Sequence, residues 1–337
     1  MRCLFLFFLL LLPVYFYSQI GGDTTYKFLN LPVSPIQNSL GGKNFIGNSS
    51  DPSQPFTNPA IINSDMSGQL ALNFSRLNNA VNYGSMGYVH SFDSQKNIFL
   101  GVNYLNYGQI EGYDEFGFKT GAFTGNEVAL SIGSSYNISY TDWYVGANTK
   151  FIFSSLAGYT SLGMAFDLGI LRKIEQYNLD IAFVVRNLGG QIDTYAGRRE
   201  KLPLDIAIAI TKQLENVPLR LHMTIDNLQQ WNLAFKNPNR SEVDLEGKVT
   251  EEKISVFNNA LRHVIVGVEI FPEKKFNIRL GYNFRKGEEM RIINQRHFAG
   301  LTAGFGFRYN RLKFDYSYAR QSVASNTSMF GVVLNMN

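Results

Sequence analysis

The chain has 337 residues, of which 45% are apolar, 14% aromatic and 17% charged, and its formal net charge is +4. The mean hydropathy of −0.11 excludes a bundle of membrane helices, and the small charge provides no basic face for a nucleic acid. The aromatic content excludes a disordered chain, and 27 Phe, 18 Tyr and 30 Gly favour an all-β fold.

Residues 1–18 are predicted to be a secretory signal peptide. Arg2 precedes an apolar run from Leu4 to Leu12, and polar Ser18 and Gln19 follow it. The run is too short for a lasting membrane anchor, although a single N-terminal membrane helix is the alternative. Cys3, the only cysteine, lies within this peptide, so we expect no disulfide or thiol chemistry in the mature chain.

Residues 19–68 are predicted to be an ordered segment that packs inside the rest of the protein. Glycine and proline interrupt every hydrophobic period in this stretch. Apolar residues such as Phe28, Phe45 and Ile61 are nevertheless spread along it, which a solvated linker would not need.

From residue 69 onward, apolar and polar residues alternate. On 276–285, Phe276, Ile278 and Leu280 share one face with Tyr282, and Asn277 and Arg279 lie on the other. Most alternating runs are close to the roughly 9 to 11 residues that a tilted strand needs to cross a bilayer. A soluble β-sandwich, with shorter strands, is the alternative. About fourteen strands are predicted, at 69–78, 82–92, 97–107, 126–139, 142–154, 160–171, 178–188, 202–212, 217–228, 260–271, 275–285, 297–309, 312–320 and 328–337.

The connections predict a transmembrane antiparallel β-barrel over residues 69–337. Every second connection is short, whereas most of the others, such as 108–125, 189–201, 229–259 and 286–296, are long. Short turns on one rim and long loops on the other are typical of barrels in the cell outer membrane. Apolar residues should then face lipid and polar residues the lumen. Aromatic residues expected in the interfacial girdles are Tyr107, Tyr140, Trp143, Tyr159, Phe271 and Tyr309.

No residue pattern indicates catalysis, a metal site or a cofactor, and we expect the protein not to be an enzyme. Gly41, Gly42 and Lys43 lack the other residues of a phosphate-binding loop. The four histidines are too far apart for a metal-binding motif. His222 and His263 fall on polar faces, where a structural hydrogen bond is the favoured role. The lumen charges are expected to pair with one another or with residues 19–68; they are Arg186, Asp205, Arg220, Asp226, Glu269, Arg279, Arg285, Lys313 and Asp315.

The connection 229–259, called the long loop below, is a candidate for partner docking. It contains Trp231 and Phe235, followed by a charged run that begins at Arg240. Exposed aromatic residues favour docking, whereas the charged run favours passive mobility, so both interpretations stay open.

Several motifs resemble the PorQ family of the type IX secretion system, which are FadL-like barrels of Bacteroidetes. The resemblance rests on Tyr83-Gly84, on Asn187-Leu188-Gly189, on the run from Asp226 to Trp231, and on the N-terminal motif. That motif comprises Leu31, Pro32, Ser34, Leu40, Gly41, Gly42, Asn58, Pro59 and Ala60. The chain departs from many outer-membrane barrels because it ends in Leu334-Asn335-Met336-Asn337 rather than in an aromatic residue.

The resemblance implies a fourteen-strand barrel with residues 19–68 as an N-terminal hatch inside it. It also implies a non-enzymatic part in an attachment complex, in which the protein anchors a PorZ-like surface partner beside PorU-like and PorV-like proteins. Outer-membrane lipid is an expected contact, and lipopolysaccharide is a further candidate. A FadL-like channel for hydrophobic compounds is the alternative function, and a lipid-modifying barrel enzyme ranks third.

Overall fold

The computed structural model describes residues 24–47, 50–77, 80–92, 96–138, 140–234, 242–243, 249–250, 254–290, 298–322 and 325–336, with the side chains of 242–243 and 249–250 left out. The signal peptide predicted for residues 1–18 lies outside the described residues.

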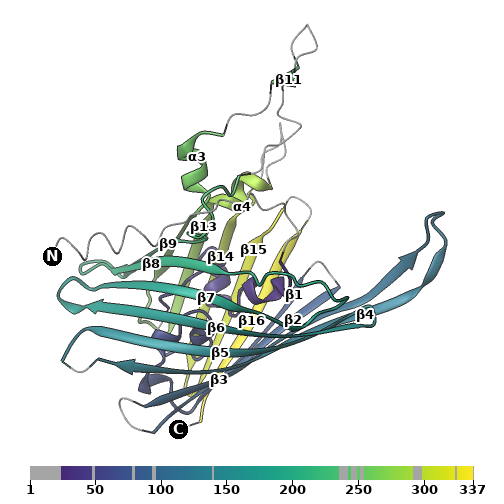
Figure 1. Ribbon diagram of the computed structural model, residues 1–337. Helices are drawn as coiled ribbons and strands as arrows, with labels where there is room; N and C mark the ends of the chain where they lie inside the picture. The colour runs from purple at the N-terminus through teal and green to yellow at the C-terminus, as the bar shows by residue number, and fades with distance from the viewer. Residues whose placement is uncertain are drawn as a thin grey trace, which may run out of the picture.

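Fourteen antiparallel strands form a closed barrel (Figure 1), as the sequence predicts. Each strand pairs with its neighbours in the chain, and β1 pairs with β16 to close the sheet. A separate two-stranded sheet, β10 (Glu242–Val243) and β11 (Val249–Thr250), lies within the long loop, so β9 pairs directly with β12. The barrel strands are β1 (Gln69–Leu77), β2 (Val81–Ser91), β3 (Asn97–Tyr113), β4 (Lys119–Asn137), β5 (Trp143–Leu156), β6 (Tyr159–Ile174), β7 (Leu179–Asp193), β8 (Asp205–Gln213), β9 (Leu219–Ile225), β12 (Val264–Ile270), β13 (Phe276–Asn283), β14 (Leu301–Tyr309), β15 (Leu312–Arg320) and β16 (Asn326–Asn335).

The two faces of each strand differ as the alternation predicts. On β13 the side chains of Phe276 and Leu280 face outward and are 46% and 42% exposed, whereas Asn277 and Arg279 face the lumen and are buried. The same division holds on β1, where Phe74 is exposed and Ser75 is buried. Such an apolar outer surface is typical of a barrel in lipid. Among the described helices, none has the length and apolar character needed to cross a membrane.

The prediction of a long loop at 108–125 is wrong, because most of this stretch continues β3 and β4 as a hairpin that projects beyond the barrel (Figure 1). Gln109 pairs with Thr124, and Gly112 pairs with Gly121. The neighbouring strands β2 and β5 do not reach this height. Both faces of the ribbon are therefore exposed, and no alternation marks it in the sequence.

The prediction that Tyr107 lies in an interfacial girdle is also wrong. Tyr107 continues the face of Asn103 and Leu105, which are buried in the lumen, and it lies just before the β-bulge between Asn106 and Gln109, so its ring faces the lumen as well. There its hydroxyl donates to the Glu127 carboxylate at 2.7 Å. The other five aromatic residues named for the girdles are exposed near strand ends; they are Tyr140, Trp143, Tyr159, Phe271 and Tyr309.

Two predicted strands run into short helices at the rim of the long loops. Helix α4 (Phe284–Glu289) begins where the sequence predicts strand to residue 285, because the Asn283 side chain accepts a hydrogen bond from Lys286 N and caps the helix. Helix α3 (Val256–Leu261) precedes β12 and is capped in the same way by Ser255.

The described N-terminal residues, 24–47 and 50–68, lie inside the barrel and are called the N-terminal segment below (Figure 1). Its short helices are η1 (Lys27–Asn30), α2 (Pro35–Ser39), η2 (Gln54–Phe56), η3 (Pro59–Ile61) and η4 (Ser64–Met66). Helix α2 contacts β13 to β16, and η3 contacts β4 to β6. The segment thus bridges opposite walls of the barrel. A further helix, η5 (Glu175–Tyr177), forms the turn between β6 and β7.

Candidate functional site: the barrel interior and the long loop

The first half of the N-terminal motif builds helix α2. Ser34 caps the helix, because its hydroxyl accepts a hydrogen bond from Gln37 N at 3.3 Å, and Pro35 occupies the first turn. Gly41 and Gly42 end it at φ 93° and 92°, a left-handed conformation that glycine adopts without a steric penalty. Gly42 N closes the turn by donating to Gln37 O at 3.0 Å.

The backbone after α2 lies directly against the barrel wall. A Cβ atom on Gly281 would come within 2.3 Å of Gly41 N, and one on Gly41 would come within 2.3 Å of the Ile265 side chain. Gly41 N also donates to the Thr302 hydroxyl at 3.0 Å, and Asn283 Nδ2 donates to Gly41 O at 3.2 Å. Glycine is therefore needed on both sides of this contact.

The remaining residues of that half pack around the turn. Leu40 is buried against β12, where a Cβ on Gly267 would approach the Leu40 side chain to 2.9 Å. Leu31 and Pro32 are half-buried, and Leu31 packs at the edge of an apolar cluster described below.

The second half of the motif docks on the opposite wall. Asn58 caps η3 by accepting a hydrogen bond from Ala60 N at 3.0 Å, and its amide donates to Phe45 O at 2.9 Å. Pro59 lies against Gly146 on β5, where an added Cβ would approach the Pro59 carbonyl carbon to 2.3 Å. Small wall residues thus accommodate both halves of the motif.

Lys43 ties the N-terminal segment to the start of β8 and to the end of β9, just before the long loop. Its buried ammonium lies 2.7 Å from a carboxylate oxygen of Asp205 and 2.7 Å from one of Asp226. Arg186 lies 3.8 Å from Asp205, and Arg285 lies 3.5 Å from Asp226. One cation therefore bridges two carboxylates, each of which has a second cation nearby.

A second network runs along the wall from β9 to β15. Arg220 pairs with Glu269 at 3.4 Å, and Arg279 pairs with Glu269 at 3.1 Å. Arg279 also pairs with Asp315 at 2.8 Å, and Asp315 contacts Lys313 at 3.4 Å. The expectation that lumen charges pair with one another or with the N-terminal residues is thus confirmed for the nine charges named above.

An apolar cluster lies in the lumen toward the rim of the long loops. The N-terminal segment contributes Tyr26, Phe28 and Leu29, and the wall contributes residues such as Leu105 and Ile152. Residues 194–204 cover the cluster from the side, with Leu202 buried in it and Tyr195 packed against it. The Arg186 guanidinium borders the cluster and donates to Leu29 O at 2.9 Å.

The barrel wall is incompletely paired where residues 194–204 pass. The β7–β8 ladder ends at Arg186 and Asp205, although β7 continues to Asp193 and pairs with β6. A bulge at this level places Asn187 at φ 57°. In the described chain, the edge of β7 beyond Arg186 therefore faces residues 194–204 rather than a neighbouring strand.

The base of the long loop is rigidly held. The rings of Trp231 and His263 stack at 5.4 Å, and His263 Nε2 lies 3.0 Å from Trp231 O. Asn259 Oδ1 accepts hydrogen bonds from the backbone N–H groups of Leu233 and Ala234, and its amide donates to Trp231 O. Trp231 itself is 50% exposed. Phe235 and Arg240, the other candidate docking residues, lie outside the described residues.

Apolar side chains gather on the described part of this rim. Val256 and Phe257 on α3 are each 73% exposed, and Phe298 and Met290 near α4 are also exposed. These four residues form what we call the α3 patch. Sequence reasoning missed α3, because Val256 and Phe257 follow a charged run that indicates mobility.

Lys286 on α4 lies above the N-terminal segment. Its Nζ donates to Gln321 Oε1 at 2.9 Å. Burial of the ammonium, with added repulsion from Arg285 and Lys43, lowers the pKa of Lys286 from 10.5 to about 8. The rim thus carries a cation that loses its proton more easily than an exposed lysine.

The described residues contain no cluster of His, Cys, Asp and Glu that could hold a metal ion. His222 and His263, weighed as candidates, make hydrogen-bonding contacts: His222 Nδ1 lies 2.9 Å from the Thr211 hydroxyl, and His263 Nδ1 lies 2.7 Å from Asp226 O.

No protein-family model matches the sequence, and no curated protein is significantly similar to it. Solved structures share the fold. The toluene transporter TodX of Pseudomonas putida has a TM-score of 0.51 and 14% identity, over 91% of this chain and 98% of that one. The monoaromatic hydrocarbon channel CymD has a TM-score of 0.52 and 11% identity, over 90% and 97%. A FadL homologue of Pseudomonas aeruginosa has a TM-score of 0.51 and 10% identity, over 90% and 98%. This chain thus has the fold of FadL-type outer-membrane barrels.

Proposed function

We propose that this protein is an outer-membrane channel that admits a small hydrophobic compound, with the N-terminal segment controlling the passage. The outer-membrane location is supported by the apolar outer surface and by the closure of the sheet through the β1–β16 pair. The fold shared with hydrocarbon channels favours this function over the surface anchor that the family resemblance implies.

The observation that carries the proposal is the apolar cluster beneath residues 194–204. A hydrophobic compound needs an apolar site. Phe28, Leu29 and Leu202 supply one, and they lie where β7 lacks a neighbouring strand within the described chain. Movement of the N-terminal segment together with residues 194–204 would open this cluster toward the membrane through the side of the barrel.

The chain offers a direct test, because the segment and the covering loop touch through their backbones. Thr24 and Lys201 form a β-bridge, and Thr25 N donates to Lys201 O at 2.9 Å. Residues bridged in this way lie within the range that a disulfide spans. The double variant Thr24→Cys/Lys201→Cys should therefore lock the segment to the loop when oxidised.

The assay is uptake of radiolabelled toluene by Gram-negative cells that carry the protein. We expect uptake above that of cells with an empty vector, loss of the excess on oxidation of the double variant, and recovery on reduction. Each single-cysteine variant is the matched control and should be insensitive to oxidation. Uptake equal to that of the empty vector in both redox states would refute the channel.

The second candidate function is anchoring of a secretion partner at the cell surface, as the resemblance to the PorQ family implies. It is favoured by the α3 patch, because exposed apolar residues on a fixed base are typical of protein interfaces. A PorZ-like protein, with PorU-like and PorV-like members of the same complex, is the proposed partner.

A pull-down from solubilised outer membranes of the native host, with proteins identified by mass, tests this anchor. The double variant Val256→Asp/Phe257→Asp should release the partner, as should deletion of the long loop. Tyr177→Asp, at an exposed aromatic residue on the opposite rim, is the matched control and should retain it. Equal retention by all variants would exclude docking at the α3 patch.

A further inference from the structure

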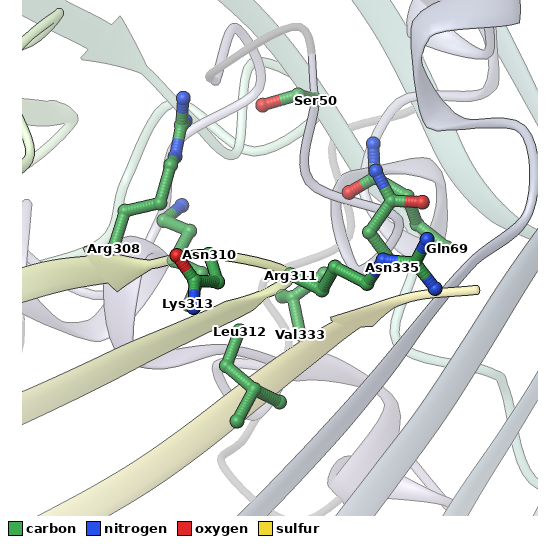
Figure 2. Close-up of a pocket in the computed structure, with 9 residues that line it drawn as sticks. All are labelled: Ser50, Gln69, Arg308, Asn310, Arg311, Leu312, Lys313, Val333 and Asn335. Carbon is green, nitrogen blue, oxygen red and sulfur yellow. The ribbon is translucent and has the colours of Figure 1, made fainter. Parts of the chain in front are cut away.

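A pocket opens into the lumen at the rim of the short turns, on the opposite side from the proposed apolar passage. It has a volume of about 260 Å³ and lies around the turn between β14 and β15. Figure 2 shows its nine lining residues, of which Arg308, Arg311 and Lys313 are cations. Gln69, Asn310 and Asn335 add side-chain amides, of which the Gln69 amide donates to Asp65 O at 2.6 Å.

The register of the sheet places two of these cations against each other. Arg308 on β14 is directly opposite Lys313 on β15, and both project to the same face of the sheet (Figure 2). Like charges at directly opposite positions of antiparallel strands destabilise a sheet. This arrangement therefore lacks a counter-charge that would lie between the two side chains.

The acidic groups nearby are already engaged. Asp315 contacts Lys313 at 3.4 Å but is held more closely by Arg279, at 2.8 Å. Asp51, which follows the lining residue Ser50, accepts hydrogen bonds within its own segment, from Ser53 N and Gln54 Nε2.

The three cations remain only partly neutralised by described residues. Lys313 is 7% exposed, and its Nζ has no hydrogen-bond acceptor in the part of the chain that the structure describes. Within that same part, neither Arg308 nor Arg311 forms an ion pair. A buried ammonium whose one carboxylate contact, Asp315, is shared with Arg279 is incompletely neutralised, so the pocket favours an anionic occupant.

The lumen network points to the same occupant. Positive and negative groups alternate along it from Arg220 through Glu269, Arg279 and Asp315 to Lys313. The next charge is Arg308, which breaks the alternation. An anion held between Lys313 and Arg308 would restore it.

We propose that this pocket binds a phosphate group. Two guanidinium groups and one ammonium suit a doubly charged oxyanion, because arginine binds phosphate through two parallel hydrogen bonds and lysine acts as a point charge. The phosphate can belong to a free small molecule that enters the lumen mouth or to a lipid headgroup at the same rim. The proposal does not depend on either function proposed above.

Isothermal titration of the mature protein in a non-ionic detergent with inorganic phosphate tests the site. We expect saturable binding that Arg308→Gln and Arg311→Gln each weaken at least about tenfold, since a hydrogen bond to a charged group contributes on this scale. Lys274→Gln is the matched control, because it removes an exposed cation from the neighbouring short turn and should bind as the unaltered protein does. Heat-dependent migration in gels verifies that each barrel is folded.

A competition arm identifies the source of the phosphate. Displacement of bound phosphate by micelle-solubilised phosphatidylglycerol would assign the site to a lipid headgroup, and no displacement would assign it to a free phosphate compound. The absence of saturable phosphate binding, or an equal loss in Lys274→Gln, would overturn the proposal.

Discussion

Replacing Lys43 by methionine should loosen the N-terminal segment without unfolding the barrel. The ammonium is buried and lies 2.7 Å from both Asp205 and Asp226, so the change leaves two carboxylates short of a cation. Removing one partner of a buried ion pair costs about 3–5 kcal/mol. Arg186 and Arg285 lie 3.8 and 3.5 Å from the same carboxylates, which favours the lower end of that range. A cost of about 3 kcal/mol raises the population of undocked segment roughly a hundredfold.

Thiol labelling measures this population directly, because the only native cysteine is Cys3. A reporter cysteine at Ser39, which is fully buried on α2, should react with maleimide only when the segment undocks. In this background, Lys43→Met should raise the labelling rate about a hundredfold, and Lys43→Arg should raise it far less. Lys27→Met removes an exposed cation from the same segment and is the control. Equal rates for Lys43→Met and Lys27→Met, with both barrels folded by gel migration, would refute the reasoning.

Three further predictions concern the wall, the rim and the base of the long loop. Gly281→Ala should destabilise the docked segment by about 1–3 kcal/mol, because the added Cβ would meet Gly41 N at 2.3 Å. Gly190→Ala is the control, because its Cβ meets no atom within 4 Å. Labelling of the reporter cysteine at Ser39 should be faster in Gly281→Ala and unchanged in Gly190→Ala. The pKa of Lys286 is about 8 in the folded protein and 10.5 when the residue is exposed. Between these pH values the folded state binds fewer protons than the unfolded state, so the free energy of unfolding should rise with pH. Lys286→Met should therefore raise the melting temperature at pH 7 and flatten its rise toward pH 10, and an unchanged slope would contradict the assignment. His263→Ala should speed hydrogen exchange at the amides of Leu233 and Ala234, since it removes the ring that stacks on Trp231; exchange at the rate of the unaltered protein would show that Asn259 alone holds the base.

The barrel could be predicted from the sequence because each strand carries its own signal. Alternation along 276–283 indicates that one face of the strand contacts apolar surroundings and the other does not. The pattern within one strand is enough for this assignment, and the neighbouring strands need not be known. The ribbon formed by the ends of β3 and β4 carried no such signal, since both of its faces are exposed. Tyr107 was misplaced although alternation was readable there, because it shares the face of Asn103 and Leu105, and a position near the strand end does not by itself put an aromatic ring in lipid.

The sequence predicts that the lumen charges are paired, but not which residue pairs with which. Charges on lumen faces must be paired, so pairing itself was predictable. The bridge from Lys43 to Asp205 and Asp226 was not, because residues 162 or more positions apart meet only after the barrel closes with a particular register. The opposition of Arg308 and Lys313 was in principle readable, since a short turn at Asn310 and Arg311 fixes which residues of the hairpin face each other.

The pairing of β1 with β16 imposes an order on assembly. The N-terminal segment leads directly into β1, yet its helix α2 rests on β13 to β16, which are synthesised after the other barrel strands. Its binding surface therefore does not exist until the final hairpin has joined the sheet, and the segment must be kept from aggregating until then. A chain truncated before β16 would leave two open sheet edges and a displaced N-terminal segment at the same time, so formation of β16 decides whether both the sheet and its interior are complete.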